Sequence, residues 1–187
     1  MTRIAIFGSG SGSNAENIIR YFIGNENVDV VLVLSNKPNA QVLERAEKYL
    51  IPTLVFTNDQ LNNSSIVSDG LKECNASIIV LAGFLRKIPQ FIIQNYPNSI
   101  VNIHPALLPK YGGRRMYGMN VHRAVVDNHE QETGITIHYV NENYDEGAII
   151  FQATCAVHSN DTPELVQNKV KQLEALYFPK VIESIIQ

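Results

Sequence analysis

Five short segments in the first half of the chain are almost wholly hydrophobic, and polar or glycine-containing stretches separate them. Val, Ile and Leu dominate these segments without clean alternation, which is typical of strands buried on both faces, as in a parallel sheet. The segments are Arg3–Phe7, Val28–Leu34, Thr53–Phe56, Ser77–Leu81 and Ser99–Ile103. They predict five neighbouring strands.

The stretches between these segments carry hydrophobic residues at helical spacing. The pattern is clearest over Ala40–Leu50, and further helices are predicted at Asn14–Phe22, Leu61–Cys74 and Pro89–Asn95. Strands that alternate with helices predict right-handed βαβ units. The expected fold is therefore α/β, with a doubly wound, mostly parallel, Rossmann-like sheet.

After His104 this rhythm changes. An irregular stretch leads into a short helix, Val121–Asp127, and two strands, Thr133–Val140 and Ala148–Val157, expected to be antiparallel. The first of them alternates, so one face is expected to meet solvent or a pocket. The last helix starts at Asp161-Thr162-Pro163-Glu164 and runs nearly to Gln187, with a kink or break expected at Pro179.

Composition limits the class of protein. The 187 residues, 45% hydrophobic and 18% charged, suit one globular domain over residues 1–187. A net charge of −3 without a basic block argues against nucleic acid as the main partner. No export signal or membrane-length apolar run is found, so a cytoplasmic chain without a membrane partner is expected. The sequence leaves the oligomeric state open.

A glycine-rich turn, Gly8-Ser9-Gly10-Ser11-Gly12-Ser13-Asn14, joins the first strand to the first helix. Glycines let backbone N–H groups at the helix start approach an anion, most plausibly a phosphate. A dinucleotide fingerprint would need glycine at Ser13 and an acid near Ser35-Asn36, and a nucleotide P-loop would need a lysine in the turn. Both nucleotide interpretations are poor, and a tight turn without a ligand is the alternative.

Asn102 and His104 lie at the end of the fifth predicted strand, where ligands gather in open α/β sheets. Residues two apart in extended chain point to the same side, so an amide and an imidazole would face one point, where an oxyanion could be stabilised. The other histidines, including His138 on a predicted strand, are interpreted as structural.

Three segments resemble a known family. Asn102-Ile103-His104-Pro105-Ala106-Leu107-Leu108-Pro109 closely resembles the N-x-H-P-[SA]-L-L-P signature of the folate-dependent formyltransferases. Leu81-Ala82-Gly83-Phe84-Leu85-Arg86 is similar to the family's L-A-G-[FY]-[ML]-R, and Asp145-Glu146-Gly147 to its D-x-G. The opening Gly10-Ser11-Gly12-Ser13-Asn14 points to the branch that formylates glycinamide ribonucleotide in purine synthesis.

The resemblance implies a set of functional residues. The catalytic residues would be Asn102, His104 and Asp145, with Asp145 raising the pKa of His104 so that both Asn102 and a protonated His104 donate to the oxyanion. The half over about 1–100 would bind phosphate, and the half over about 101–187 would hold the folate and the catalytic groups. Phosphate and ribose would contact Gly12, Ser13, Asn14, Lys171 and Glu174. The folate would contact Leu85, Arg86, Lys87, Ile88, Asn102, Val140, Asn141 and Asp145.

The co-substrate implied by the resemblance is 10-formyltetrahydrofolate, its partner substrate is glycinamide ribonucleotide, and no metal is required. Several of these residues have an ordinary alternative: Leu85 and Ile88 as core, Lys171 and Glu174 as an exposed helix salt bridge, and Arg114 and Arg115 as loop charges. Methionyl-tRNA formyltransferases carry an R-G-A-A-P-like segment where this chain has Lys110-Tyr111-Gly112-Gly113, so that branch fits less well. Formyl transfer to another amine, such as that of an amino sugar nucleotide, and a folate- or nucleotide-binding protein without turnover remain alternatives.

Overall fold

The computed structural model describes residues 1–186, and Gln187 lies outside the described residues. The chain divides into two compact units, Met1–Val101 and the residues from Asn102 on. The first unit contains β1 (Thr2–Phe7), α1 (Ser13–Phe22), β2 (Val28–Ser35), α2 (Gln41–Lys48), β3 (Thr53–Val55), α3 (Asn58–Asn63), α4 (Ile66–Glu73), β4 (Ile78–Leu81) and α5 (Gln90–Asn95). Strand β5 (Ile100–His104) begins in this unit and ends in the next.

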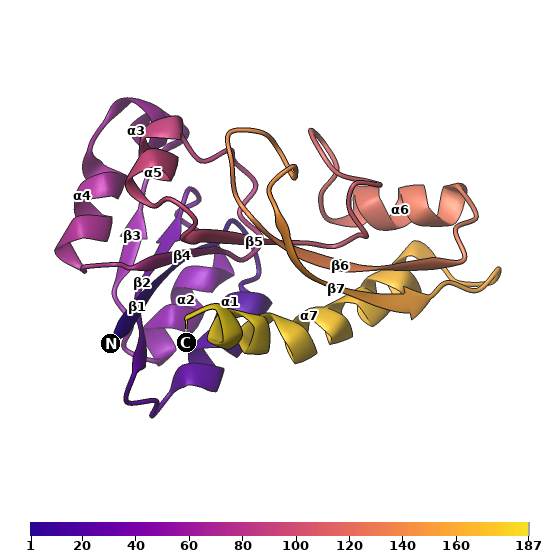
Figure 1. Ribbon diagram of the computed structural model, residues 1–187, viewed down its shortest axis with the longest axis horizontal. Helices are drawn as coiled ribbons and strands as arrows, with labels where there is room; N and C mark the ends of the chain where they lie inside the picture. The colour runs from indigo at the N-terminus through magenta and orange to yellow at the C-terminus, as the bar shows by residue number, and fades with distance from the viewer. Residues whose placement is uncertain (187) are drawn as a thin grey trace. The chain divides into compact units, whose positions relative to one another are not determined.

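The first unit is built on parallel strands in the order β3-β2-β1-β4, with β5 next to β4 (Figure 1). β1 pairs in parallel with both β2 and β4, and Phe7 lies opposite Leu34 on one side and Leu81 on the other. The β1 residues Ile4–Phe7 are completely buried, as their unbroken hydrophobic run predicted. The prediction of a parallel core sheet with βαβ connections is confirmed.

The predicted helix over Leu61–Cys74 is wrong in its start and its continuity. The structure has two shorter helices, and Ser64-Ser65 separates α3 from α4. Thr57 and Gln60 form a capping box: Thr57 Oγ1 accepts from Gln60 N at 3.1 Å, and Gln60 Oε1 accepts from Thr57 N at 2.8 Å. This cap starts α3 three residues before the predicted helix, because it satisfies backbone donors that a helix start exposes.

The second unit holds the end of β5, then α6 (Met119–Asp127), β6 (Glu132–Tyr139), β7 (Ile149–Ala156) and α7 (Pro163–Ile186). β6 follows β5 in the strand order and pairs antiparallel with β7, with Thr133 opposite Cys155. The long helix α7 packs against α6 and along the β6–β7 pair (Figure 1). The predicted antiparallel C-terminal strands are confirmed.

β6 does not turn one face to solvent over Thr133–His138, because side chains on both faces are buried there. Thr136 tolerates burial since its hydroxyl accepts from Leu108 N at 3.0 Å and donates to Ala106 O at 2.7 Å. Of the kink or break expected at Pro179, the break does not occur: α7 continues through this residue, and the neighbouring Phe178 and Ile182 are completely buried. We attribute the tolerance of this proline to the packing of its neighbours.

Within residues 1–186, no helix has both the length and the apolar character that crossing a bilayer would need.

Candidate active site

The glycine-rich turn of the first unit requires glycine at one position above all. Gly12 has φ +74°, and a Cβ atom there would lie 2.5 Å from the Cα of Val42. The turn is held against α2 because Val42 N donates to Gly10 O at 3.1 Å. Helix α1 begins directly afterwards at Ser13, so the N–H groups of its first turn lie beside a residue without a side chain. A helix start of this kind offers free N–H groups to an anion.

Ser9 ties this turn to the segment that resembles L-A-G-F-L-R. Its Oγ donates to Asn36 Oδ1 at 2.7 Å and accepts from Leu85 N at 3.2 Å. A dinucleotide-binding fold would place an acid near the end of β2, where this chain has Asn36. Here the Asn36 side chain instead holds the turn through its hydrogen bond with Ser9. Leu85 is 41% exposed, whereas Ile88 is 2% exposed and belongs to the core. Of the residues expected to meet folate here, Leu85, Arg86 and Lys87 are exposed.

The second unit brings the three expected catalytic side chains together and adds a fourth. His104 Nδ1 lies 3.6 Å from Asp145 Oδ2, and His138 Nε2 lies 3.7 Å from Asp145 Oδ1. Asn102 Nδ2 donates to His138 Nε2 at 3.0 Å. The two histidine side chains are only 5% and 3% exposed, and Asp145 is 13% exposed. A carboxylate is thus flanked by two imidazoles and linked through one of them to an amide.

Hydrogen bonds to backbone carbonyls fix the neutral tautomers of both histidines. His104 Nε2 lies 2.7 Å from Tyr111 O, and His138 Nδ1 lies 2.8 Å from Tyr139 O. A carbonyl oxygen only accepts, so these nitrogens carry the protons. The lone pair of neutral His104 is therefore on Nδ1, facing Asp145, and that of His138 is on Nε2, where it accepts from Asn102.

The loop before β7 holds Asp145 in an unusual backbone conformation. Asp145 has φ +56°, in the left-handed region that Asp and Asn tolerate better than most residues. Its Oδ2 accepts from Gly113 N at 2.8 Å. Two residues on, a Cβ at Gly147 would lie 1.7 Å from Tyr139 O, so the Asp-x-Gly spacing reflects a close approach of two backbones. The neighbouring acids Glu142 and Glu146 are exposed.

Burial has the largest effect on the pKa of His104. Burial lowers the pKa of His104 below its usual value, and this outweighs the opposing effects of Asp145 and of the bond to Tyr111. The expectation that Asp145 leaves His104 with a raised pKa is therefore wrong. Burial also acts to raise the pKa of Asp145, but the protonated forms of His138 and His104 and the Gly113 N–H together lower it. The two shifts act in the direction of an ionised Asp145 beside a neutral His104.

The other residues expected to bind folate or the ribose phosphate lie on segments that are described one by one. Val140 and Asn141 follow β6 and are half-buried, and Asn141 Oδ1 accepts from Asn143 N at 2.9 Å in the turn. Lys171 is exposed on α7, and its Nζ donates to Gln167 Oε1 at 3.1 Å. Glu174, one turn further along α7, is half-buried.

His138 belongs to this cluster but was not predicted from the sequence as a site residue. Its only sequence signal was a polar side chain at the inner position of a hydrophobic strand, two residues after Thr136. The approach to Asn102 depends on which strands are neighbours, and that information is not local in the sequence.

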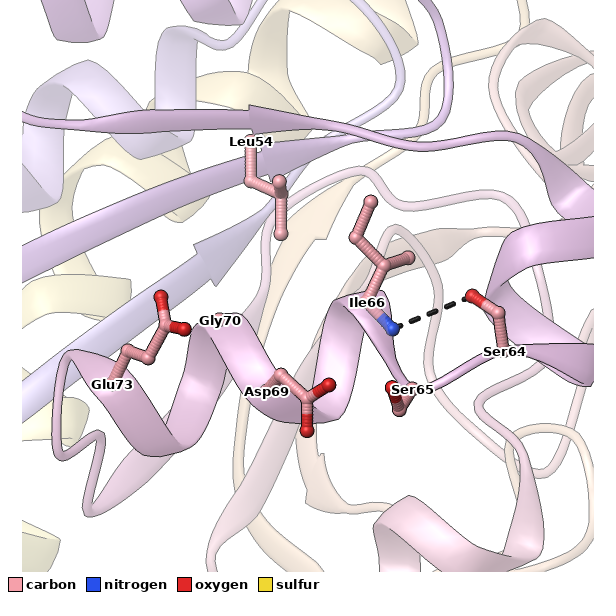
Figure 2. Close-up of a pocket in the computed structure, with 7 residues that line it drawn as sticks. All are labelled: Leu54, Ser64, Ser65, Ile66, Asp69, Gly70 and Glu73. Atoms are coloured by element: carbon pink, nitrogen blue, oxygen red, sulfur yellow. Dashed lines mark hydrogen bonds between the residues drawn. The ribbon is translucent and has the colours of Figure 1, made fainter.

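Among residues 1–186, no group of three or more His, Cys, Asp or Glu side chains is arranged to hold a metal ion. The first unit contains a cavity of about 420 Å³ between β3 and α4, lined along the length of that helix (Figure 2). Asp69 and Glu73 line it, and none of the residues expected to bind substrate does. The candidate catalytic groups are therefore the four side chains that lie together, Asn102, His104, His138 and Asp145.

Comparison with known proteins is consistent with this geometry. The family model described as formyl transferase matches residues 2–182. A chloroplastic phosphoribosylglycinamide formyltransferase of Arabidopsis thaliana is 40% identical, over 99% of this chain and 65% of that protein. This chain thus spans about two thirds of the plant relative. The phosphoribosylglycinamide formyltransferase of Bacillus subtilis is 34% identical, over 100% of this chain and 95% of that protein.

Solved structures give the same result. The phosphoribosylglycinamide formyltransferase of Anaplasma phagocytophilum is similar with a TM-score of 0.89 at 32% identity, covering 98% of this chain and 86% of that one. The glycinamide ribonucleotide transformylase 1 of Geobacillus kaustophilus is similar with a TM-score of 0.89 at 30% identity, covering 100% of both chains.

Proposed function

The chain belongs to the formyl transferase family, and we propose that it transfers the formyl group of 10-formyltetrahydrofolate to the amine of glycinamide ribonucleotide in purine synthesis. The observation that carries this proposal is the cluster of Asn102, His104, His138 and Asp145, which combines an amide donor with a buried carboxylate–imidazole pair. Relatives that match most of this chain's length carry the name phosphoribosylglycinamide formyltransferase.

In the proposed reaction the substrate amine attacks the formyl carbon, and negative charge develops on the formyl oxygen. The Asn102 amide carries two N–H donors, of which one is bonded to His138. The second is the donor that we assign to the oxyanion. His138 thus orients Asn102, because its Nδ1–H is fixed on the carbonyl of Tyr139 and only its Nε2 can accept.

The attacking nitrogen must lose a proton as the new C–N bond forms. Neutral His104 presents the lone pair of Nδ1 toward Asp145, so the pair takes up this proton, directly or through a water. The resulting imidazolium lies beside a carboxylate that stabilises it. Transfer of the proton to N10 of the folate breaks the old C–N bond and releases tetrahydrofolate and the formylated ribonucleotide. No metal and no covalent enzyme intermediate enter these steps.

The binding roles are proposed for each segment by itself. We assign the phosphate to Gly12, Ser13 and Asn14, where α1 begins, and a supporting role toward the ribose phosphate to Lys171 and Glu174. For the folate we assign the exposed Leu85, Arg86 and Lys87 together with backbone around Val140 and Asn141. Burial of Ile88 favours a structural role for that side chain.

Two other functions use the same fold, and one experiment separates them. A formyltransferase for an amino sugar nucleotide would share the catalytic set, whereas a folate-binding protein would bind without turnover. We propose to follow release of the deformylated folate from 10-formyl-5,8-dideazafolate with either acceptor, for the wild type and for His104→Ala. Turnover with glycinamide ribonucleotide alone, lost in His104→Ala with folate binding retained, is the expected result. Turnover only with the amino sugar nucleotide would refute the acceptor, and unchanged turnover in the variant would refute the role of His104.

A further inference from the structure

The loop that follows the N-x-H-P motif makes direct backbone contact with both members of the proton-transfer pair. Tyr111 O accepts from His104 Nε2 at 2.7 Å, and Gly113 N donates to Asp145 Oδ2 at 2.8 Å. If the Tyr111 carbonyl turned away, His104 Nε2 would lose its acceptor. The proton of the neutral His104 ring could then lie on either nitrogen. The position of this one carbonyl therefore determines whether the Nδ1 lone pair faces Asp145.

Tyr111 adopts a conformation that its own chemistry does not favour. Its φ is +56°, in the left-handed region that is rare for bulky aromatic residues and costs free energy for residues with a Cβ. Such a conformation persists only where surrounding contacts hold it. The Tyr111 side chain makes such a contact through its hydroxyl group.

The support comes from Glu130, which lies just after the end of α6. Tyr111 Oη donates to Glu130 Oε1 at 2.8 Å, and Lys110 Nζ donates to the two Glu130 oxygens at 3.0 and 3.1 Å. Glu130 is itself anchored, because its N–H donates to Val125 O at 3.2 Å where the helix ends. The Glu130 side chain is 23% exposed, so the contact is partly shielded from water, while Lys110 is 67% exposed.

We propose that Glu130 is a positioning residue for His104, acting through Tyr111. Glu130 holds the Tyr111 ring, the ring fixes the left-handed backbone, and the Tyr111 carbonyl keeps His104 in the Nε2–H tautomer with its lone pair toward Asp145. Glu130 does not touch the reacting atoms. This inference rests on the proposed function for its consequence in catalysis, but the tautomer itself can be observed without any substrate.

The test uses the full chain and the variants Tyr111→Phe and Glu130→Ala, with Glu132→Ala as the matched control. Tyr111→Phe removes only the hydroxyl, and Glu132 is an exposed glutamate two residues further along. The His104 ring is observed by ¹⁵N NMR, and kcat and KM are measured with 10-formyl-5,8-dideazafolate and glycinamide ribonucleotide. The expected result is a pure Nε2–H tautomer in the wild type and control and a mixture of tautomers in both variants.

In the same variants we expect kcat to fall about tenfold, the size of effect that loss of one hydrogen bond to a charged group can give, with both KM values within about twofold. The double variant should be no worse than either single one, since both break the same linkage. An unchanged tautomer in Tyr111→Phe and Glu130→Ala would overturn the proposal, as would an equal loss of kcat in the control. Absence of any formyl transfer in the wild type would refute the proposed function but leave the NMR test valid.

Discussion

Replacing Asp145 with asparagine removes one negative charge from the candidate site while changing little else. Asparagine has the same shape, tolerates the φ of +56° found at this position, and keeps an oxygen that can accept from Gly113 N. Folding should therefore be retained. The change isolates the electrostatic effect of the carboxylate on His104 and His138.

The size of the effect follows from the distance between His104 Nδ1 and Asp145 Oδ2. Opposite unit charges 3.6 Å apart attract by about 4.6 kcal/mol at an effective dielectric constant of about 20. This attraction exists only when His104 has taken up the proton, so its loss raises the barrier and leaves substrate binding nearly unchanged. Because the asparagine dipole retains part of it, we expect kcat to fall about 100-fold to 1000-fold.

The assay is steady-state release of the deformylated folate at saturating glycinamide ribonucleotide, with Glu146→Gln as the control for loss of one exposed charge beside the site. KM for both substrates should stay within about threefold of the wild type. A folded Asp145→Asn enzyme with kcat within about tenfold of the wild type would refute the reasoning. An equal loss in Glu146→Gln would show that general charge, and not this contact, is responsible.

Other substitutions test the turn, a buried histidine and the fourth site residue. Gly12→Ala should destabilise the chain by roughly 2–5 kcal/mol in urea unfolding, since it combines left-handed strain with a clash against Val42, whereas a Cβ at Gly10 would meet no described atom within 4 Å and Gly10→Ala should cost far less. His122 is buried, its Nδ1 finds no hydrogen-bond partner among the described residues, and burial followed by the charges of Lys171 and His104 lowers its pKa to about 4. Between its usual pKa of 6.5 and about 4 only the unfolded chain binds a proton at His122, so stability should fall as pH drops through this window, by up to about 1.36 kcal/mol per pH unit. Urea unfolding at pH 7 and pH 5 should show a smaller pH effect in His122→Gln, and an identical pH effect would contradict the assignment. His138→Phe keeps a ring but removes the acceptor for Asn102, so kcat should fall while KM changes less. Unchanged kcat and KM would show that His138 has no role in the site.

The sequence predicted those parts of the fold that depend on local pattern. The hydrophobic runs identified β1 to β5 to within one residue at either end. The pattern is clearest where a strand is buried on both faces, as β4 is throughout, because no polar position interrupts it. The helix over Leu61–Cys74 was wrong because a four-residue cap at Thr57–Gln60 outweighed the weak hydrophobic periodicity. A break at Pro179 does not occur, and we attribute this to the burial of its neighbours Phe178 and Ile182, which no local rule includes.

The candidate site likewise combines residues that local sequence patterns predict with one that they do not. Asn102 and His104 were predicted because their spacing on one strand is a local property, and Asp145 because its segment resembles that of the family. His138 was not predicted because its partners are not adjacent to it in the sequence. Asn102 lies 36 residues before it, and Asp145 lies seven residues after it. The direction of the pKa shift of His104 was misjudged because sequence reveals a nearby carboxylate but not the depth of burial, which here has the larger effect.

The most direct test of the central claim is to follow the formyl carbon itself. The full chain is mixed with 10-[¹³C]formyltetrahydrofolate and glycinamide ribonucleotide, and the products are observed by ¹³C NMR. The account predicts that the label appears on the glycinamide nitrogen in equal amount to the tetrahydrofolate formed, and that no folate is deformylated without the ribonucleotide. Label recovered as formate, with or without the ribonucleotide, would contradict the account and identify a hydrolase.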